Sequence, residues 1–141
     1  GDGEEEENLK KLTRELGLDN QVLFLKNTSI DLKNALLAKS NIFVMPSIIY
    51  KNSVEGFGIV FVEAAQHGVP SIVGKDGGGA DAIIHKKTGL ICDGNNLNEI
   101  YSNICELLDN NKFTEYGKVA KENSKNFHWE QIIKKYKKII N

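Results

Sequence analysis

Residues 53–68, with the sequence SVEGFGIVFVEAAQHG, decide the fold of this 141-residue chain. The β-branched and aromatic run at residues 59–62 favours a strand, but the segment continues into EAAQ at residues 63–66 and ends at Gly68, which is typical of a helix that stops at a glycine. A helix that packs against a sheet can be apolar around most of its circumference. We therefore predict a helix that begins near Gly58.

A glycine-flanked loop leads into this predicted helix. The first turn of a helix presents free backbone N–H groups and the positive end of the helix dipole, which together favour an anion such as a diphosphate. Gly56 and Gly58 lack a Cβ atom, so a ligand can approach the backbone closely, and Glu55 can accept hydrogen bonds from sugar hydroxyls. Glu63 shares a helical face with Ile59 that we expect to be buried, so its carboxylate needs a partner such as a ribose diol.

The rest of the chain alternates between short apolar runs and amphipathic segments. The apolar runs predict buried strands at residues 22–25, 42–45, 71–73 and 89–92. The amphipathic segments predict helices at residues 9–16, 31–39, 97–108, 113–120 and 129–140. This alternation is typical of βα units around a parallel sheet rather than of a helical bundle or a β-sandwich.

A second glycine-rich segment follows the predicted strand at residues 71–73. It contains Gly77, Gly78 and Gly79 in succession. Ligands of open α/β sheets gather at the carboxyl ends of the strands, so we predict that this loop lies at the ligand cleft. An ordinary strand-to-helix turn is the alternative interpretation.

Composition excludes several classes of function. Lys and Arg number 18 and Asp and Glu 19, so the net charge of −1 provides no global positive field to attract nucleic acid. No apolar run approaches the roughly 18 residues that span a bilayer. Cys92 and Cys105 lie far apart with no histidine at ligand spacing, which predicts neither a zinc site nor a disulfide framework and suggests a reducing, cytoplasmic location. Because the only methionine is Met45, we expect a piece of a longer polypeptide.

Several motifs occur in an order that resembles a known family. Glu55 and Glu63 have Glu-x7-Glu spacing. The other motifs are Gly1-Asp2-Gly3 before an acidic helix, VLFL at residues 22–25, FVMPS at 43–47, GVP at 68–70, TGL at 88–90 and FHWE at 127–130. Together they resemble the C-terminal domain of the retaining, nucleotide-sugar-dependent glycosyltransferases of family 4 (group 1), which have the GT-B architecture of two facing Rossmann-like domains.

The resemblance covers essentially the whole chain and implies its fold. Residues 1–141 would be part of the donor-binding C-terminal GT-B domain, with a Rossmann-like parallel sheet, flanking helices and its first strands missing. The acceptor-binding N-terminal domain would be absent. Since the strand at residues 22–25 would then lack its neighbours, we expect these residues alone to fold poorly and not to catalyse.

The resemblance also implies an activity and a role for each motif residue. A hexose would pass from a nucleoside diphosphate to a glycan or lipid-linked acceptor with retention at the anomeric carbon, and no metal would be required. Glu55 would be the catalytic residue and would bind donor-sugar hydroxyls, and Glu63 would bind the ribose. The sugar and diphosphate would face Gly56, Phe57, Gly58 and Ile59, the base would face Leu25, Lys26 and Asn27, and the cleft loop would contain Gly77, Gly78 and Asp81.

Some residues depart from the family pattern. Asp81 stands where a glutamate is usual, Gly79 and Ala80 replace bulkier residues, and Lys26 stands where a glycine commonly follows the strand. The family's phosphate-binding arginine and lysine lie upstream of its Gly-Asp-Gly loop. A nucleotide-sugar epimerase of related fold, or a non-catalytic nucleotide-sugar-binding module, therefore remains an alternative.

The last predicted helix carries Lys134, Lys135, Lys137 and Lys138. The simplest interpretation is that these lysines form its solvated face. A basic amphipathic helix can also contact anionic lipid, so peripheral contact with the inner face of the membrane is the alternative.

Overall fold

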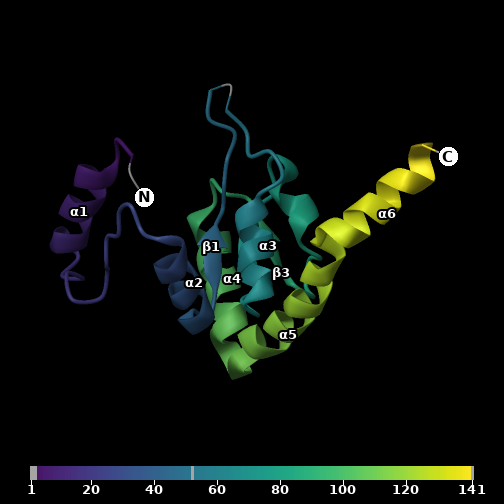
Figure 1. Cartoon of the computed structure of the whole chain (residues 1–141). Helices are drawn as coiled ribbons and strands as arrows, with labels where there is room; N and C mark the ends of the chain where they lie inside the picture. Colours follow the sequence, from purple (N-terminus) through teal and green to yellow (C-terminus); the bar gives the residue numbers. More distant parts are fainter. Residues whose placement is uncertain (1–2, 52, 141) are drawn as a thin grey trace. The chain divides into compact units, whose positions relative to one another are not determined.

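A computed structural model describes residues 3–51 and 53–140 (Figure 1). The chain divides into two compact units, Gly1–Ala35 and Leu36–Asn141, and the division falls inside helix α2 (Ile30–Lys39). Gly1 and Asp2 of the predicted Gly-Asp-Gly loop lie outside the described residues.

The first unit contains helix α1 (Glu6–Glu15), which begins within the predicted acidic run and stops at the predicted glycine. Gly17 has a φ of +66° and donates its amide to Arg14 O, while the Leu18 amide bonds to Thr13 O. These two bonds form a Schellman motif, which satisfies carbonyl groups at the end of the helix. Leu9 and Leu12, which belong to the apolar stripe of α1, are exposed.

The predicted strand at residues 22–25 is wrong. These residues adopt no regular secondary structure, and Leu23 is 76% exposed. An apolar run predicts burial from local sequence, but a strand also needs a neighbour for its backbone N–H and C=O groups. Within the described part of the first unit no strand is available to pair with this segment.

The second unit is built on a parallel sheet, as predicted. Its strands β1 (Phe43–Met45), β2 (Ser71–Gly74) and β3 (Gly89–Cys92) lie in the order β1-β2-β3. Phe43 pairs with Ser71, and Ser71 pairs with Gly89, so the three carboxyl ends meet at one edge. Loops that follow β2 and β3 are thereby brought side by side.

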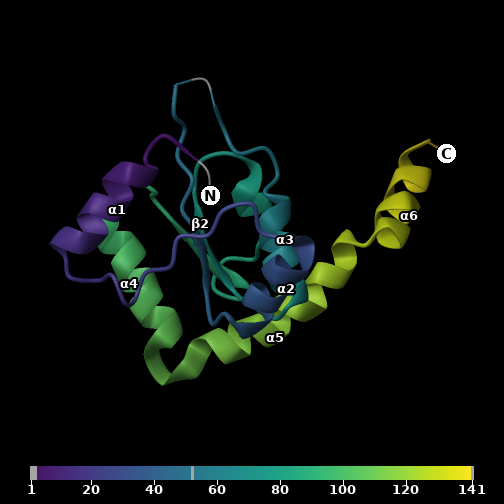
Figure 2. The same ribbon diagram turned by 60° about the vertical axis from the view of Figure 1, so that its left-hand side comes forward.

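Helices cover both faces of the sheet. Successive side chains of a strand point to opposite faces, and the apolar residues on each face of β2 pack against a different helix. Val73 packs with Phe61 and Val62 of α3 (Ile59–Gln66), whereas Ile72 packs with Leu107 of α4 (Leu97–Leu108). Figure 2 shows α3 and α4 on opposite sides of β2. The two apolar clusters make this unit a small three-layer domain.

Five helical elements remain, of which η1 lies between β2 and β3 and the others follow α4. They are the 3₁₀ turns η1 (Gly78–Ala82), η2 (Asp109–Asn111) and η3 (Lys125–Phe127) and the helices α5 (Lys112–Ser124) and α6 (Trp129–Ile140). Helix α5 packs closely against the C-terminal end of α3, where Gly117 faces Gly68. Helix α6 projects away from the sheet in both views (Figures 1 and 2).

We predict that Gly117→Ala destabilises the protein. The added methyl group would lie 2.0 Å from the carbonyl oxygen of Gly68, so the α3–α5 contact must open. Overpacking of this kind costs about 1–3 kcal/mol and opposes the gain of up to about 1 kcal/mol that alanine brings inside a helix. Urea denaturation measures the effect, with the exposed neighbour Lys118→Ala as control. A raised midpoint for Gly117→Ala, the result expected from helix propensity alone, would show that the helices are not in contact here.

Candidate functional site

The segment at residues 53–68 folds as a loop and a helix, as predicted. Gly58 has a φ of +72° and precedes α3, and a Cβ at this position would lie 2.4 Å from the ring of Phe61. At the other end Gly68 has a φ of +77° and donates to Ala65 O, while Val69 donates to Ala64 O. Burial of Phe61 explains why the helix forms despite its β-branched residues: tertiary packing outweighs local strand propensity.

The two glycine-containing loops are in direct contact. The Gly78 amide donates to Glu55 O at 2.9 Å. A Cβ at Gly78 would lie 1.7 Å from Gly56 O, and one at Gly77, where φ is +80°, would lie 2.6 Å from Glu55 O. The backbones approach so closely that no side chain fits between them. The loop after β2 and the loop before α3 therefore form one structural unit.

The side chains around this contact differ in exposure. Glu55 is half-buried, Gly56 is exposed, and the Phe57 ring packs against Phe127 with centroids 5.6 Å apart. Phe127 belongs to the FHWE motif and packs against the Phe61 cluster, so it supports the loop from the body of the domain. Asp81, in η1, is exposed.

We expected the helical face that carries Glu63 to be buried, but the structure leaves this face partly exposed. Ile59 is 68% exposed and Glu63 is half-buried, whereas Phe61, Val62 and Ala64 face the core. The buried arc of α3 is displaced from the predicted one because the sheet lies under residues 61, 62 and 64. Glu63 and Glu55 thus both remain accessible from solvent.

The residues predicted to line the base pocket belong to the first unit. Leu25 is half-buried, Asn27 has a φ of +48°, and Lys26 forms an ion pair with Glu6. Hydrogen bonds from Lys10 and Lys26 lower the pKa of Glu6 to about 2. The positive charge of Lys26 is therefore neutralised locally, which sequence reasoning missed because the pair joins residues 20 positions apart.

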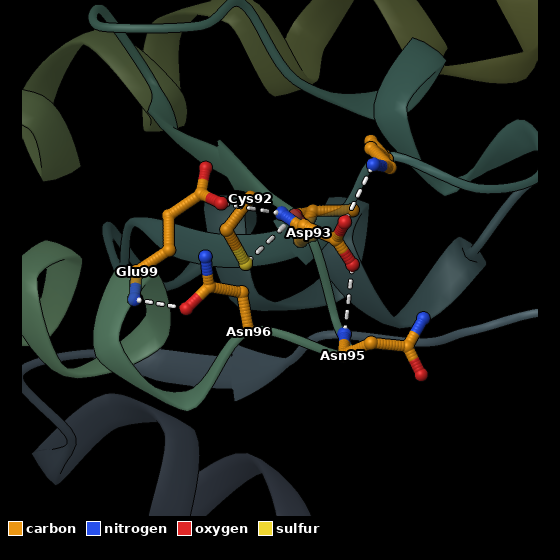
Figure 3. A network of polar contacts seen from close by, with 7 residues as sticks. Cys92, Asp93, Asn95, Asn96 and Glu99 are labelled. Carbon is orange, nitrogen blue, oxygen red and sulfur yellow. Dashed lines mark hydrogen bonds and ion pairs between the residues drawn. The ribbon is translucent and has the colours of Figure 1, made fainter.

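A polar network at the carboxyl ends of β2 and β3 was also missed (Figure 3). The Lys75 ammonium donates to Asp93 Oδ2 at 2.6 Å, and the Asp93 amide donates to Glu99 Oε2 at 3.1 Å. The hydrogen bond between Lys75 and Asp93 raises the pKa of Lys75 and lowers the pKa of Asp93.

An open cavity of about 470 Å³ lies beside this network, lined by Lys75, His85, Ile91, Cys92, Asp93, Asn96 and Glu99. Part of the network is readable from sequence: Asn96 caps α4 by accepting from the Glu99 amide, at the spacing of a capping box.

Comparison with known proteins identifies the family. The family model described as "Glycosyl transferases group 1" matches residues 1–127. The chain belongs to this family. One relative is a GDP-mannose-dependent α-(1-6)-phosphatidylinositol monomannoside mannosyltransferase of Mycobacterium tuberculosis. The two sequences are 35% identical over 125 aligned residues, which make up 86% of this chain and 32% of the relative. The chain thus spans about a third of the length of the curated relatives it matches.

Solved structures of glycosyltransferases share the fold of this group 1 chain. Sucrose-phosphate synthase from Thermosynechococcus elongatus superposes with a TM-score of 0.79 and 26% identity, over 99% of this chain and 35% of that one. HepE of Anabaena in complex with UDP-glucose superposes with a TM-score of 0.73 and 26% identity, over 86% of this chain and 33% of HepE. These matches confirm the Rossmann-like α/β fold of the GT-B class that the motifs predicted.

Within residues 3–51 and 53–140, no group of three or more His, Cys, Asp or Glu side chains is placed to hold a metal ion. Across the same ranges, no helix has both the length and the apolar character needed to cross a membrane.

We predict that Gly78→Ala separates the two loops of this group 1 domain, whereas Gly56→Ala does not. A Cβ at Gly78 collides with a carbonyl oxygen, but a Cβ at Gly56 meets no atom within 4 Å. We expect Gly78→Ala to lower the free energy of unfolding by about 1–3 kcal/mol. Chemical denaturation of the two variants in parallel measures this difference, and equal stability would contradict the close approach.

Proposed function

We propose that this chain is the donor-binding part of a metal-independent, retaining glycosyltransferase of family 4. Its donor is a nucleoside diphosphate hexose, and its acceptor is a glycan or a lipid-linked glycan. The observation that carries the proposal is the contact of the two glycine loops at the N-terminus of α3, in which the Gly78 amide fixes the backbone of Glu55. An acceptor-binding domain completes the enzyme, and residues 1–141 alone do not transfer sugar.

The chemistry of the loops supports a sugar diphosphate as ligand. The amides at the start of an α-helix have no intrahelical acceptor and carry the positive end of the dipole, which suits the diphosphate. Gly56 leaves open space next to these amides, so a ligand can reach the backbone. In this proposal Phe57, Gly58 and Ile59 provide the surrounding backbone contacts.

The acidic residues recognise the two ends of the donor. Glu55 is the catalytic residue, because its carboxylate binds hydroxyls of the transferred sugar and orients the anomeric carbon. Glu63 binds the ribose hydroxyls. As the glycosidic bond breaks, fixed backbone dipoles stabilise the negative charge on the departing nucleoside diphosphate. Gly77, Gly78 and Asp81 border the same cleft.

The relatives support this class of donor. The mycobacterial mannosyltransferase is named for GDP-mannose, and HepE was crystallised with UDP-glucose. Both compounds contain a nucleoside diphosphate joined to a hexose, and this shared chemistry is what the proposed site binds.

We predict that Glu55→Gln weakens donor binding and abolishes most transfer without unfolding the protein. Hydrogen bonds to a charged group contribute about 1.5–3 kcal/mol, so the donor Kd should rise by about ten- to a hundredfold. Calorimetric titration of UDP-glucose and GDP-mannose into the complete protein measures the Kd, and product analysis with an acceptor measures transfer. Glu115→Gln, at an exposed position of α5, is the control.

Three outcomes would contradict the proposal. Unchanged affinity in Glu55→Gln would remove Glu55 from the site. A free sugar isomer formed without acceptor would indicate an epimerase. Absence of heat with either donor would favour a non-catalytic module.

We further propose that the complete protein works at the cytoplasmic face of the membrane through peripheral contact by α6. Trp129, Tyr136 and Ile139 of this helix are exposed on one side, at 76%, 62% and 80%. Four lysines occupy the opposite side and its flanks: Lys134, Lys135, Lys137 and Lys138. An exposed apolar stripe bordered by lysines suits an anionic lipid surface.

We predict salt-sensitive binding of the complete protein to vesicles that contain anionic lipid. Changing the four α6 lysines to glutamine should weaken binding at least about tenfold, since each lysine near such a surface contributes about 1 kcal/mol. Vesicle flotation measures it, and glutamine at Lys11, Lys86, Lys87 and Lys118 is the matched control. Equal binding to zwitterionic vesicles, or none to either kind, would refute lipid contact.

A further inference from the structure

The strands β2 and β3 continue their pairing one residue beyond the sheet. Gly74 is in register with Cys92, and the next amide, that of Lys75, donates to Cys92 O at 2.8 Å. Lys75 and Asp93 are thus the first residues past the two carboxyl ends. Their side chains join there, with Nζ and Oδ2 2.6 Å apart. An ion pair therefore closes the end of the ladder.

Asp93 is held in place from two other directions. Its Oδ1 atom accepts from the Asn95 amide at 2.9 Å, and its own amide donates to Glu99 Oε2 at 3.1 Å. Glu99 lies in the first turn of α4, whose cap is Asn96. Figure 3 shows these bonds converging on Asp93 between the strand end and the helix. The carboxylate that binds Lys75 is consequently anchored to both β3 and α4.

Lys75 is also the residue that begins the loop to the glycines. Only Asp76 separates it from Gly77, and the next amide, that of Gly78, bonds to Glu55 O. The contact between the loops leaves no free space, because a Cβ at Gly78 would lie 1.7 Å from Gly56 O. A small movement of the loop at Lys75 therefore reaches the backbone that carries Glu55.

We propose that Lys75, fixed by Asp93, is a positioning residue of the donor site. It sets the loop at residues 76–79 against Glu55 and so aligns the backbone that receives the sugar diphosphate. The inference rests on the proposed function for its effect on donor binding. Its effect on the loop itself does not depend on any ligand.

A purely stabilising role would have different consequences. The side chains of Lys75 and Asp93 are 54% and 32% exposed, and exposed ion pairs contribute little to the free energy of unfolding. Loss of the pair should therefore hardly change global stability. A positioning role instead predicts a local change at Gly78 and a weaker donor complex.

The test uses substitutions that remove one partner at a time. Lys75→Met keeps the length of the side chain without its charge. Asp93→Asn keeps an acceptor for the Asn95 amide but removes the charge that faces Lys75. In each variant of the complete protein we expect hydrogen exchange at the Gly78 amide to accelerate about two- to fivefold and the donor KM to rise by a similar factor, with kcat and the melting temperature unchanged.

Three controls separate this role from others. The double variant Lys75→Met/Asp93→Asn should resemble either single variant, because both remove the same interaction. Lys75→Arg should restore the Gly78 exchange rate and the donor KM. Lys87→Met, at an exposed position outside the network, should change neither quantity.

The outcomes distinguish this inference from the proposed function. If the unsubstituted protein binds neither UDP-glucose nor GDP-mannose, the proposed function fails, and faster exchange at Gly78 in both single variants still supports positioning of the loop. Unchanged exchange at Gly78 overturns the inference whatever the donor does. Additive effects in the double variant, or a drop in melting temperature as large as that of Gly78→Ala, overturn it as well.

Discussion

The hydrogen bond from the Gly78 amide to Glu55 O is the interaction on which the candidate site depends. It joins a loop that follows β2 to a loop that precedes α3, and it forms only because Gly77 and Gly78 have no side chains to hold the backbones apart. The parallel sheet makes this possible by bringing strand ends to one edge. The site is therefore built mainly from backbone, and side chains determine how that backbone is aligned.

Sequence predicted this part of the structure well because the decisive signals are local. The run at residues 59–62 resembles a strand, but Gly58 and Gly68 bracket it with positions that need positive φ, and these mark the ends of a helix. The glycine-rich segment after β2 lies against Glu55 in the structure, and its place at a ligand cleft stays a prediction. The roles of Glu55 and Glu63 toward a donor remain predictions.

The features that the sequence could not predict depend on contacts between residues far apart in the chain. The run at residues 22–25 has the composition of a buried strand, yet Leu23 is exposed because strand formation needs a neighbouring chain segment. Lys75 and Asp93 are 18 positions apart and meet only because their strands are in register. The cap of α4 by Asn96 could have been read locally, but its connection through Glu99 to Asp93 could not.

These features together explain how a weak surface interaction can matter more for binding than for folding. The core depends on residues such as Phe61, Ile72 and Leu90, whose burial stabilises the domain whether or not the loop at residues 76–79 is aligned. Fixed backbone dipoles, in contrast, stabilise developing charge only in the orientation in which they are held. Since the proposed donor site is made of backbone and has no flexible side chain to absorb a small displacement, the proposed role of the ion pair at the start of the loop is to act on donor affinity through geometry, although its own energy is small.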